Sequence, residues 1–223
     1  MTDWNIRTAA WKERLQYFGR TLHEYLGPHR WRRSQPIDDR VALARFLDTR
    51  ASYIAQTSLY GYLRTRAGMR FPELFDDDPF VVSINIAKWH VWLACLSDLA
   101  VYTGGMLLRS GSAPAEVVGQ LIRGLVEEIL AAQGVPEGSD EQYPAHADRV
   151  RARVAGCDWT RVTDDDGPFS QSPAAVVRWA PIIDELKELD EGIVLNSVRF
   201  RWHEVRRDLR RNLDADGVLR SDG

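Results

Sequence analysis

Residues 80–108 read FVVSINIAKWHVWLACLSDLAVYTGGMLL and form the most apolar stretch of the chain. Apolar side chains cover most of the circumference of a helix built from it, which is typical of a helix that other helices surround. Lys88, His90 and Asp98 interrupt the stretch. A full charge inside a membrane-spanning helix costs roughly 2.5–3.5 kcal/mol on insertion scales. The stretch therefore predicts the core helix of a bundle, and we expect no transmembrane segment.

The sequence on both sides of this stretch predicts further helices, separated by Pro and Gly. The expected helices cover about residues 3–26, 36–67, 79–108, 114–133, 144–155, 172–189 and 191–213. The sixth of them should kink near Pro181. No stretch alternates apolar and polar residues as a half-buried strand does. The predicted fold class is all-α: a single-domain bundle of about six or seven helices with long central helices.

The first expected helix carries a heptad row with a large aromatic residue at every seventh position. The row consists of Trp4, Thr8, Trp11, Leu15, Phe18, Leu22 and Tyr25. Because an α-helix turns by about 100° per residue, these side chains form one stripe along the helix. The stripe must be buried against the rest of the chain or against another chain, so it favours a protein partner or self-association.

One helical domain is expected to cover residues 1–213. Residues 135–172 have the weakest pattern within it, because Pro, Gly, Asp and Ser are frequent there and only one short helix is supported. Such a segment is the best place for a mobile or functional loop. Residues 214–223 are polar, and we expect them to form a flexible C-terminal tail.

The composition is that of an ordinary globular protein. Hydrophobic residues make up 44% of the 223 residues and charged residues 27%, with a net charge of −3. This charge gives no reason to expect a nucleic-acid partner. The two cysteines cannot form a disulfide framework and suit a reducing compartment. The N-terminus lacks the basic and apolar regions of a secretory signal, so we expect a cytoplasmic protein.

Motifs for catalysis, phosphate binding and metal binding are missing from the sequence. We find no nucleophile elbow, no dinucleotide-binding glycine pattern and no Walker phosphate loop. The five histidines, His23, His29, His90, His146 and His203, lie far apart in sequence and show no metal-ligand spacing. We expect no metal and no cofactor.

Polar side chains share one face of the second expected helix. Arg45, Asp48, Ser52, Gln56 and Tyr60 follow steps of three, four, four and four residues. A cation, an anion, a hydroxyl and an amide on one face can bind a polar ligand through several directed hydrogen bonds. The alternative is that this face is simply the solvated side of an amphipathic helix.

The third expected helix contributes Lys88 and His90 as further candidates for the same ligand site. A neutral imidazole beside a hydroxyl or a carboxylate is what a general base needs. Ser97 and Asp98 supply such groups on the same helix. The alternative is that His90 is a hydrogen-bonded residue of the core.

Two patches combine aromatic and basic residues. The segment that follows the first helix contains Arg30, Trp31, Arg32 and Arg33, and the last helix carries six arginines, including Arg206 and Arg210. This mixture suits an anionic membrane surface or a phosphate-rich partner. The alternative is that the arginines are solvated and form local ion pairs.

These patterns favour a non-enzymatic helical adaptor, regulator or assembly protein that acts through protein contacts. The aromatic row and the surplus of Trp and Arg support this function, because interfaces favour these residue types. The rival hypothesis is a small-molecule enzyme, hydrolase-like, with a polar pocket between the second and third helices. Arg45, Asp48, Lys88 and His90 would line that pocket. A third hypothesis is a small-molecule sensor that uses the same pocket.

Overall fold

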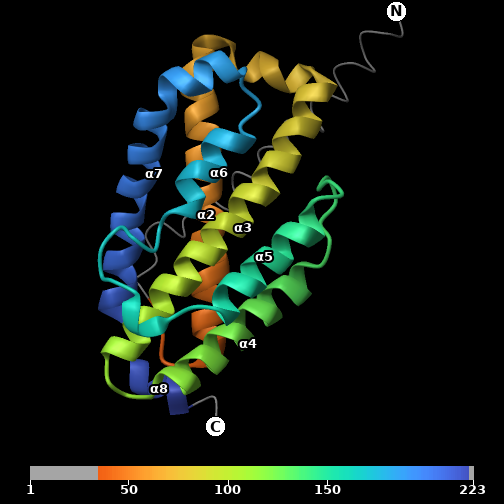
Figure 1. Ribbon diagram of the computed structural model, residues 1–223. Coiled ribbons are helices and arrows are strands. Elements are labelled where there is room, and N and C mark those ends of the chain that lie inside the picture. The colour runs from red at the N-terminus through yellow and green to blue at the C-terminus, as the bar shows by residue number, and fades with distance from the viewer. Residues whose placement is uncertain (1–34, 221–223) are drawn as a thin grey trace, which may run out of the picture. The chain divides into compact units, whose positions relative to one another are not determined.

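The computed structural model describes residues 35–220, and its seven α-helices confirm the all-α prediction (Figure 1). They are α2 (Arg40–Ala67), α3 (Asp78–Arg109), α4 (Ala115–Gln133), α5 (Tyr143–Ala155), α6 (Gln171–Trp179), α7 (Asp184–Asn212) and α8 (Ala215–Arg220). Two 3-10 helices, η2 (Gly68–Asp76) and η3 (Trp159–Arg161), lie between them. The described residues contain no strand, only one isolated bridge between Ile37 and Leu213.

The chain divides into two compact units, residues 1–35 and 36–223. The predicted first helix with its aromatic row, and the basic segment with Arg30, Trp31, Arg32 and Arg33, lie outside the described residues. The prediction of one domain over residues 1–213 therefore stays a prediction. Everything that follows concerns the second unit.

Helix α3 is the central element of this unit. It packs against α2, α4, α5 and α6, so its side chains are buried on most of its circumference. Leu96, Leu99 and Tyr102 are completely buried. By length and composition alone α3 resembles a membrane span, and 89% of its most apolar window is buried inside the protein. The four neighbouring helices thus explain why apolar residues cover most of the circumference of α3.

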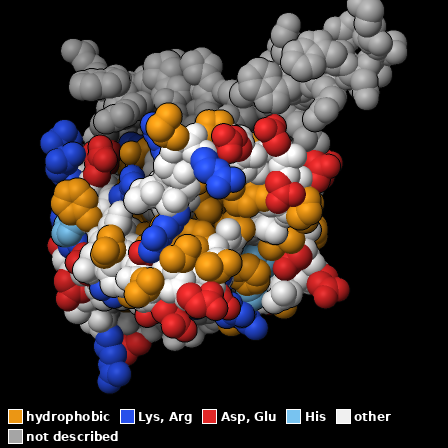
Figure 2. Space-filling view, turned by 90° about the horizontal axis from the view of Figure 1, so that it is seen from above, with side chains coloured by type: hydrophobic (Ala, Val, Ile, Leu, Met, Phe, Trp, Pro, Cys, Tyr) orange, Lys and Arg blue, Asp and Glu red, His pale blue; other side chains and the backbone are white. Residues whose placement is uncertain are grey.

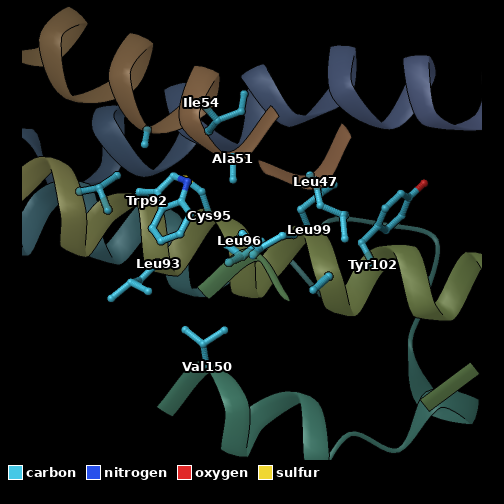
Figure 3. Packing of buried hydrophobic residues seen from close by; sticks show 14 of the residues in the cluster. Leu47, Ala51, Ile54, Trp92, Leu93, Cys95, Leu96, Leu99, Tyr102 and Val150 are labelled. Carbon is cyan, nitrogen blue, oxygen red and sulfur yellow. The ribbon is translucent and has the colours of Figure 1, made fainter. Parts of the chain in front are cut away.

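The contact between α2 and α3 forms the largest part of the core (Figure 3). From α2, Leu47 and Ala51 point toward α3, which contributes Trp92 and Cys95, and Ile54 belongs to the same buried cluster. The three α2 positions follow steps of four and three residues, which places them on one side of the helix. Burial raises the pKa of the Cys95 thiol, so this cysteine behaves as a small core residue.

Helix ends follow local sequence chemistry. Asp39 caps α2, because its side chain accepts a hydrogen bond from the backbone N–H of Ala42 at 2.6 Å. Gly134 ends α4 with a positive φ of 61°, a conformation that glycine adopts without steric cost. The predicted boundaries of α2, α3, α4 and α5 agree with the structure to within a few residues.

The predicted boundary between the last two long helices is wrong. We expected a helix over residues 172–189 with a kink near Pro181, followed by a helix over residues 191–213. Instead α6 ends at Trp179, and α7 runs unbroken from Asp184 to Asn212. Pro181 lacks a backbone N–H and its ring clashes with the preceding turn, so the helix ends there rather than bending.

Residues 215–220 form helix α8, where we expected a flexible tail. The side chain of Asp214 accepts a hydrogen bond from the N–H of Gly217, which caps the helix. Val218 is completely buried. The backbone of Asp214 also donates to the carbonyl of Ile37. Asp214 and Ile37 are far apart in sequence, so the polar composition of residues 214–223 alone could not predict that residues 215–220 form a docked helix.

One end of the bundle, where η2 and the junction between α6 and α7 lie, exposes apolar side chains among charged ones (Figure 2). Met69 in η2, Val82 in the first turns of α3 and Ile183 before α7 are all more than half exposed. Apolar residues scattered over a surface are common in soluble proteins. We therefore assign no role to this end.

Candidate functional site

A groove lined by described residues lies between α5 and α6, with α3 as its floor. Its volume is about 320 Å³. The lining residues are His90, Leu93, Ala94, His146, Arg149, Val150, Ser170, Gln171, Ala174, Ala175, Arg178 and Trp179. The floor is largely apolar and the rim is polar, which is typical of small-molecule sites.

Three side chains form a hydrogen-bonded row beside this groove. Nε2 of His90 lies 2.8 Å from a carboxylate oxygen of Asp140, and Nδ1 of His90 lies 2.6 Å from Nδ1 of His146. The ring of Trp179 stacks on His90 with a centroid distance of 3.7 Å. The edge of His146 also contacts Trp179. The two imidazoles are therefore fixed by hydrogen bonds and by one indole ring.

The row determines which nitrogen atoms carry protons. A carboxylate can only accept, so His90 donates its Nε2–H to Asp140, and its Nδ1 is then an acceptor. His146 accordingly donates its Nδ1–H to His90. This leaves Nε2 of His146 as an unprotonated acceptor, and this atom forms no hydrogen bond with residues 35–220. A neutral imidazole oriented through its other nitrogen is the arrangement of a general base.

Both imidazoles resist protonation in the folded protein. Burial lowers the pKa of His90; Asp140 opposes this effect, and the charge of Arg178 adds to it. Burial also lowers the pKa of His146; His90, Arg149 and Arg178 add to this effect, and Asp140 opposes it. Desolvation disfavours a charged imidazole, and neighbouring cations disfavour it further. At neutral pH both rings are therefore uncharged.

Two arginines on the groove have no acidic partner. The guanidinium groups of Arg149 and Arg178 form no ion pair and no hydrogen bond with any described residue. Arg178 lies 5.3 Å from the centre of the Trp179 ring. Both arginines are exposed, and both are close enough to the imidazoles to affect the pKa of His146. The groove thus combines two unneutralised cations with one free imidazole nitrogen.

The segment before α5 holds Asp140 in place. Its carboxylate also accepts from the backbone N–H of Gln142 at 3.2 Å, and its carbonyl accepts from the N–H of Tyr143. The indole of Trp89 donates to the carbonyl of Glu137 in the same segment. Asp residues form such local bonds to the backbone two residues on, which fixes turns before helices.

A buried ion pair fixes α6 against α3. Asp98 is completely buried, and Arg153 of α5 donates to it at 2.6 Å. The backbone N–H groups of Gln171 and Ser172, at the start of α6, also donate to Asp98. Burial raises the pKa of Asp98, while Arg153 and the start of α6 counteract this effect. One carboxylate thus joins the three helices that form the groove.

Of the seven predicted ligand-binding residues, only His90 lines this groove. Arg45 on α2 is exposed, and its guanidinium has no acidic partner among the described residues. Ser52 and Gln56 are buried, and Tyr60 is partly buried. These side chains remain on α2, on the other side of α3 from α5 in the bundle (Figure 1).

Asp48 and Lys88, two of the predicted pocket residues, form no ion pair with each other. Asp48 is partly buried and bonds to the indole of Trp92; burial raises the pKa of its carboxyl group, and that bond opposes the shift. The ammonium of Lys88 lies 4.6 Å from the centre of the Trp89 ring. Burial lowers the pKa of Lys88. Both groups therefore contact indole rings of α3 instead of each other.

Two of the arginines predicted to contact an anionic surface, Arg206 and Arg210, form ion pairs with acidic residues of the same chain. Arg206 is buried, and its guanidinium bonds to Asp166 at 2.5 Å and to the carbonyl of Asp164. Arg210 pairs with the Asp164 side chain, also at 2.5 Å. The local ion-pair alternative describes both residues. The reason is that the acidic loop before α6 folds back onto α7.

Sequence analysis did not identify Asp140, His146, Arg149, Arg178 or Trp179 as site residues. A weak indication existed, because His146, Arg149 and Arg153 follow steps of three and four on the short helix that interrupts the irregular segment. Their meeting with His90 depends on the packing of α5 and α6 against α3, which no local pattern encodes. The described residues contain no group of three potential ligands arranged for a metal ion.

No protein-family model, no curated protein and no solved structure matches this chain.

Proposed function

We propose that this protein binds a small organic anion, carrying a carboxylate or phosphate group, in the groove between α5 and α6. The observation that carries the proposal is the row Asp140–His90–His146, whose free imidazole nitrogen lies in one groove with two unpaired guanidinium groups. The sequence had already suggested a small-molecule site, but between α2 and α3. The site proposed here lies on the other side of α3.

The charges of the groove favour an anion. Guanidinium groups recognise carboxylates and phosphates through paired hydrogen bonds. Most of the other arginines in residues 35–220 already have a carboxylate close by, whereas Arg149 and Arg178 have none. An anion between them would supply the missing partner. The groove, at about 320 Å³, lies at the small end of the range for ligand sites.

His146 gives the binding a proton linkage. An anion placed beside its Nε2 favours the charged imidazole, so the pKa of His146 should rise on binding from its lowered value in the free protein. Binding should then take up a proton near neutral pH and become tighter as the pH falls. The hydrogen bonds from His146 to His90 and from His90 to Asp140 can stabilise the positive charge that His146 gains, because they link it to a carboxylate.

The adaptor hypothesis receives less support from the described residues. Its aromatic row and its Trp31 segment lie outside them, and Arg206 and Arg210 are neutralised internally. A cytoplasmic location, a protein partner and contact with an anionic membrane remain predictions. An enzymatic role for His146 would add turnover to the same binding site.

Isothermal titration calorimetry with sulfate and acetate tests the proposal, because neither ion titrates near neutral pH. Sulfate stands for a phosphate group and acetate for a carboxylate. At least one should bind, and Arg149→Ala or Arg178→Ala should weaken it about tenfold or more, since hydrogen bonds to charged groups contribute about 1.5–3 kcal/mol. Arg45→Ala is the matched control, because Arg45 is an exposed arginine without a partner on another helix.

The same titration in buffers of different ionisation enthalpy measures proton uptake. His146→Gln should abolish the uptake, whereas His203→Gln, on the exposed face of α7, should leave it unchanged. If neither ion binds at millimolar concentration, the proposal is contradicted. It is also contradicted if the Arg149→Ala and Arg178→Ala variants bind the ion as tightly as the wild type does.

A further inference from the structure

The outer face of α7 carries a row of exposed apolar side chains. Leu189, Ile193 and Phe200 are 75%, 74% and 76% exposed. The side of α7 that packs on the core lies opposite and consists of Val194, Val198, Trp202, Val205 and Leu209. Because the exposed residues follow steps of four and seven, they share one side of the helix over about 16 Å. Apolar residues scattered singly need no explanation, but a straight row does.

Unlike charges lie at the two ends of this row. On the side of this row, the first turn of α7 exposes Glu185, and the last turns expose Arg207 and Arg211 together with Glu204. None of these side chains has a bonded partner among residues 35–220. The helix therefore presents an apolar centre between one acidic and one basic end.

We propose that this face binds a second copy of the same chain, with the two α7 helices antiparallel about a twofold axis. In that orientation the acidic start of one helix lies beside the basic end of the other. Leu189 and Ile193 of one copy then meet Phe200 of the second copy. A parallel pair would instead place acids beside acids and arginines beside arginines. A face that is complementary to itself in the antiparallel sense fits a twofold dimer whose axis is perpendicular to the two helices.

The centre of the row permits a close approach. A Cβ atom added to Gly192 would meet nothing within 4 Å, so the helix surface there is open. Asn196 lies between Ile193 and Phe200 on the same face and can bond to its counterpart near the twofold axis. One helix pair buries less surface than the roughly 1,200–2,000 Å² of a standard interface, so we expect a dissociation constant on the order of micromolar.

Sedimentation velocity of the full chain over a concentration series tests the dimer. The wild type should shift from monomer to dimer, and Phe200→Glu should raise the dissociation constant about tenfold or more, as expected for a central apolar contact. Met69→Glu is the matched control, because Met69 is 97% exposed on η2, away from the row. The control should dimerise as the wild type does.

Charge reversal tests the orientation. Glu185→Lys or Arg207→Glu alone should weaken the dimer, and the double variant should restore it. A tighter dimer in Glu185→Gln would indicate parallel helices, because it would relieve the repulsion between two adjacent glutamates, and would overturn the proposal. A monomer at every concentration would also overturn it, as would a dimer that responds to Trp11→Ala but not to Phe200→Glu. A monomer that loses binding to anionic vesicles in Phe200→Glu would assign the row to a lipid surface instead.

Discussion

Two arginine clusters of this protein differ in whether the chain neutralises them. Arg206 and Arg210 on α7 meet an acidic loop, and their charges pair with Asp166 and Asp164. Arg149 and Arg178, on α5 and α6, meet no acid among the described residues. The first cluster stabilises a loop, whereas the second can receive a ligand. Arginine content alone therefore does not identify a binding surface; the position of the counter-charges does.

Among the arginines of residues 35–220 that pair with a carboxylate, Arg153 has the most buried partner, Asp98. We therefore expect the largest effect on stability when this pair is broken. Asp98→Ala should lower the free energy of unfolding by about 3–5 kcal/mol, because it leaves a largely buried guanidinium without its carboxylate. It also removes the acceptor for two N–H groups at the start of α6. Urea denaturation measures the loss. Asp98→Asn keeps the shape and should cost less; a loss below about 1 kcal/mol in Asp98→Ala would mean that the pair is not structural.

Arg206 should show the next largest effect. Arg206→Ala removes an ion pair with Asp166 and ring contacts with Tyr102 and Phe169 at 5.5 and 5.8 Å. We expect a loss of about 1–3 kcal/mol, since Asp166 is half-exposed and can be solvated again. Arg207→Ala, at the next position but exposed, should change stability by less than about 0.5 kcal/mol. Equal losses in both variants would contradict the distinction between paired and unpaired arginines.

Much of the fold could be predicted from local sequence. The apolar circumference of α3 and the row Val194–Val198–Trp202 of α7 follow from helical periodicity, and both are buried. Gly134 and Asp39 mark helix ends through their own backbone chemistry. Helix α8 could not be predicted this way, because the burial of Val218 and the bond from the Asp214 N–H to the carbonyl of Ile37 depend on residues far away in sequence.

The site could be predicted only in part, for a related reason. His90 was identified because an imidazole inside an apolar helix is conspicuous. Its partners Asp140 and His146 are 50 and 56 residues away in sequence and come from other elements. Spacing carries information within one helix, and it carries none about which helices later pack together. The same limit explains why Arg206 was assigned to a surface, since Asp166 lies 40 residues before it.

The lowered pKa values of His90 and His146 predict how the groove responds to pH. In the unfolded chain histidine has a pKa near 6.5. In the folded protein burial lowers the pKa of both rings, so they become protonated only at lower pH. As the pH falls below about 6.5, the unfolded state binds more protons than the folded state, so the free energy of unfolding should decrease. Urea denaturation at several pH values should show this decrease, and His90→Gln should reduce it. Stability that rises on acidification would mean that Asp140 stabilises a charged imidazole instead.

The smallest effects on stability should occur at the groove arginines. This small effect on the free energy of unfolding distinguishes the two clusters most clearly. Arg149→Ala and Arg178→Ala should change the free energy of unfolding by less than about 0.5 kcal/mol, because each side chain is exposed and leaves no partner behind. Removing a cation should also relieve its repulsion of a protonated His146, so the pKa of His146 should rise in both variants. Histidine resonances followed by NMR over a pH series measure that rise. Arg45→Ala should leave the resonances unchanged. A groove arginine whose removal destabilised the fold as much as Arg206→Ala would belong to the paired class, and the anion site would lose its main argument.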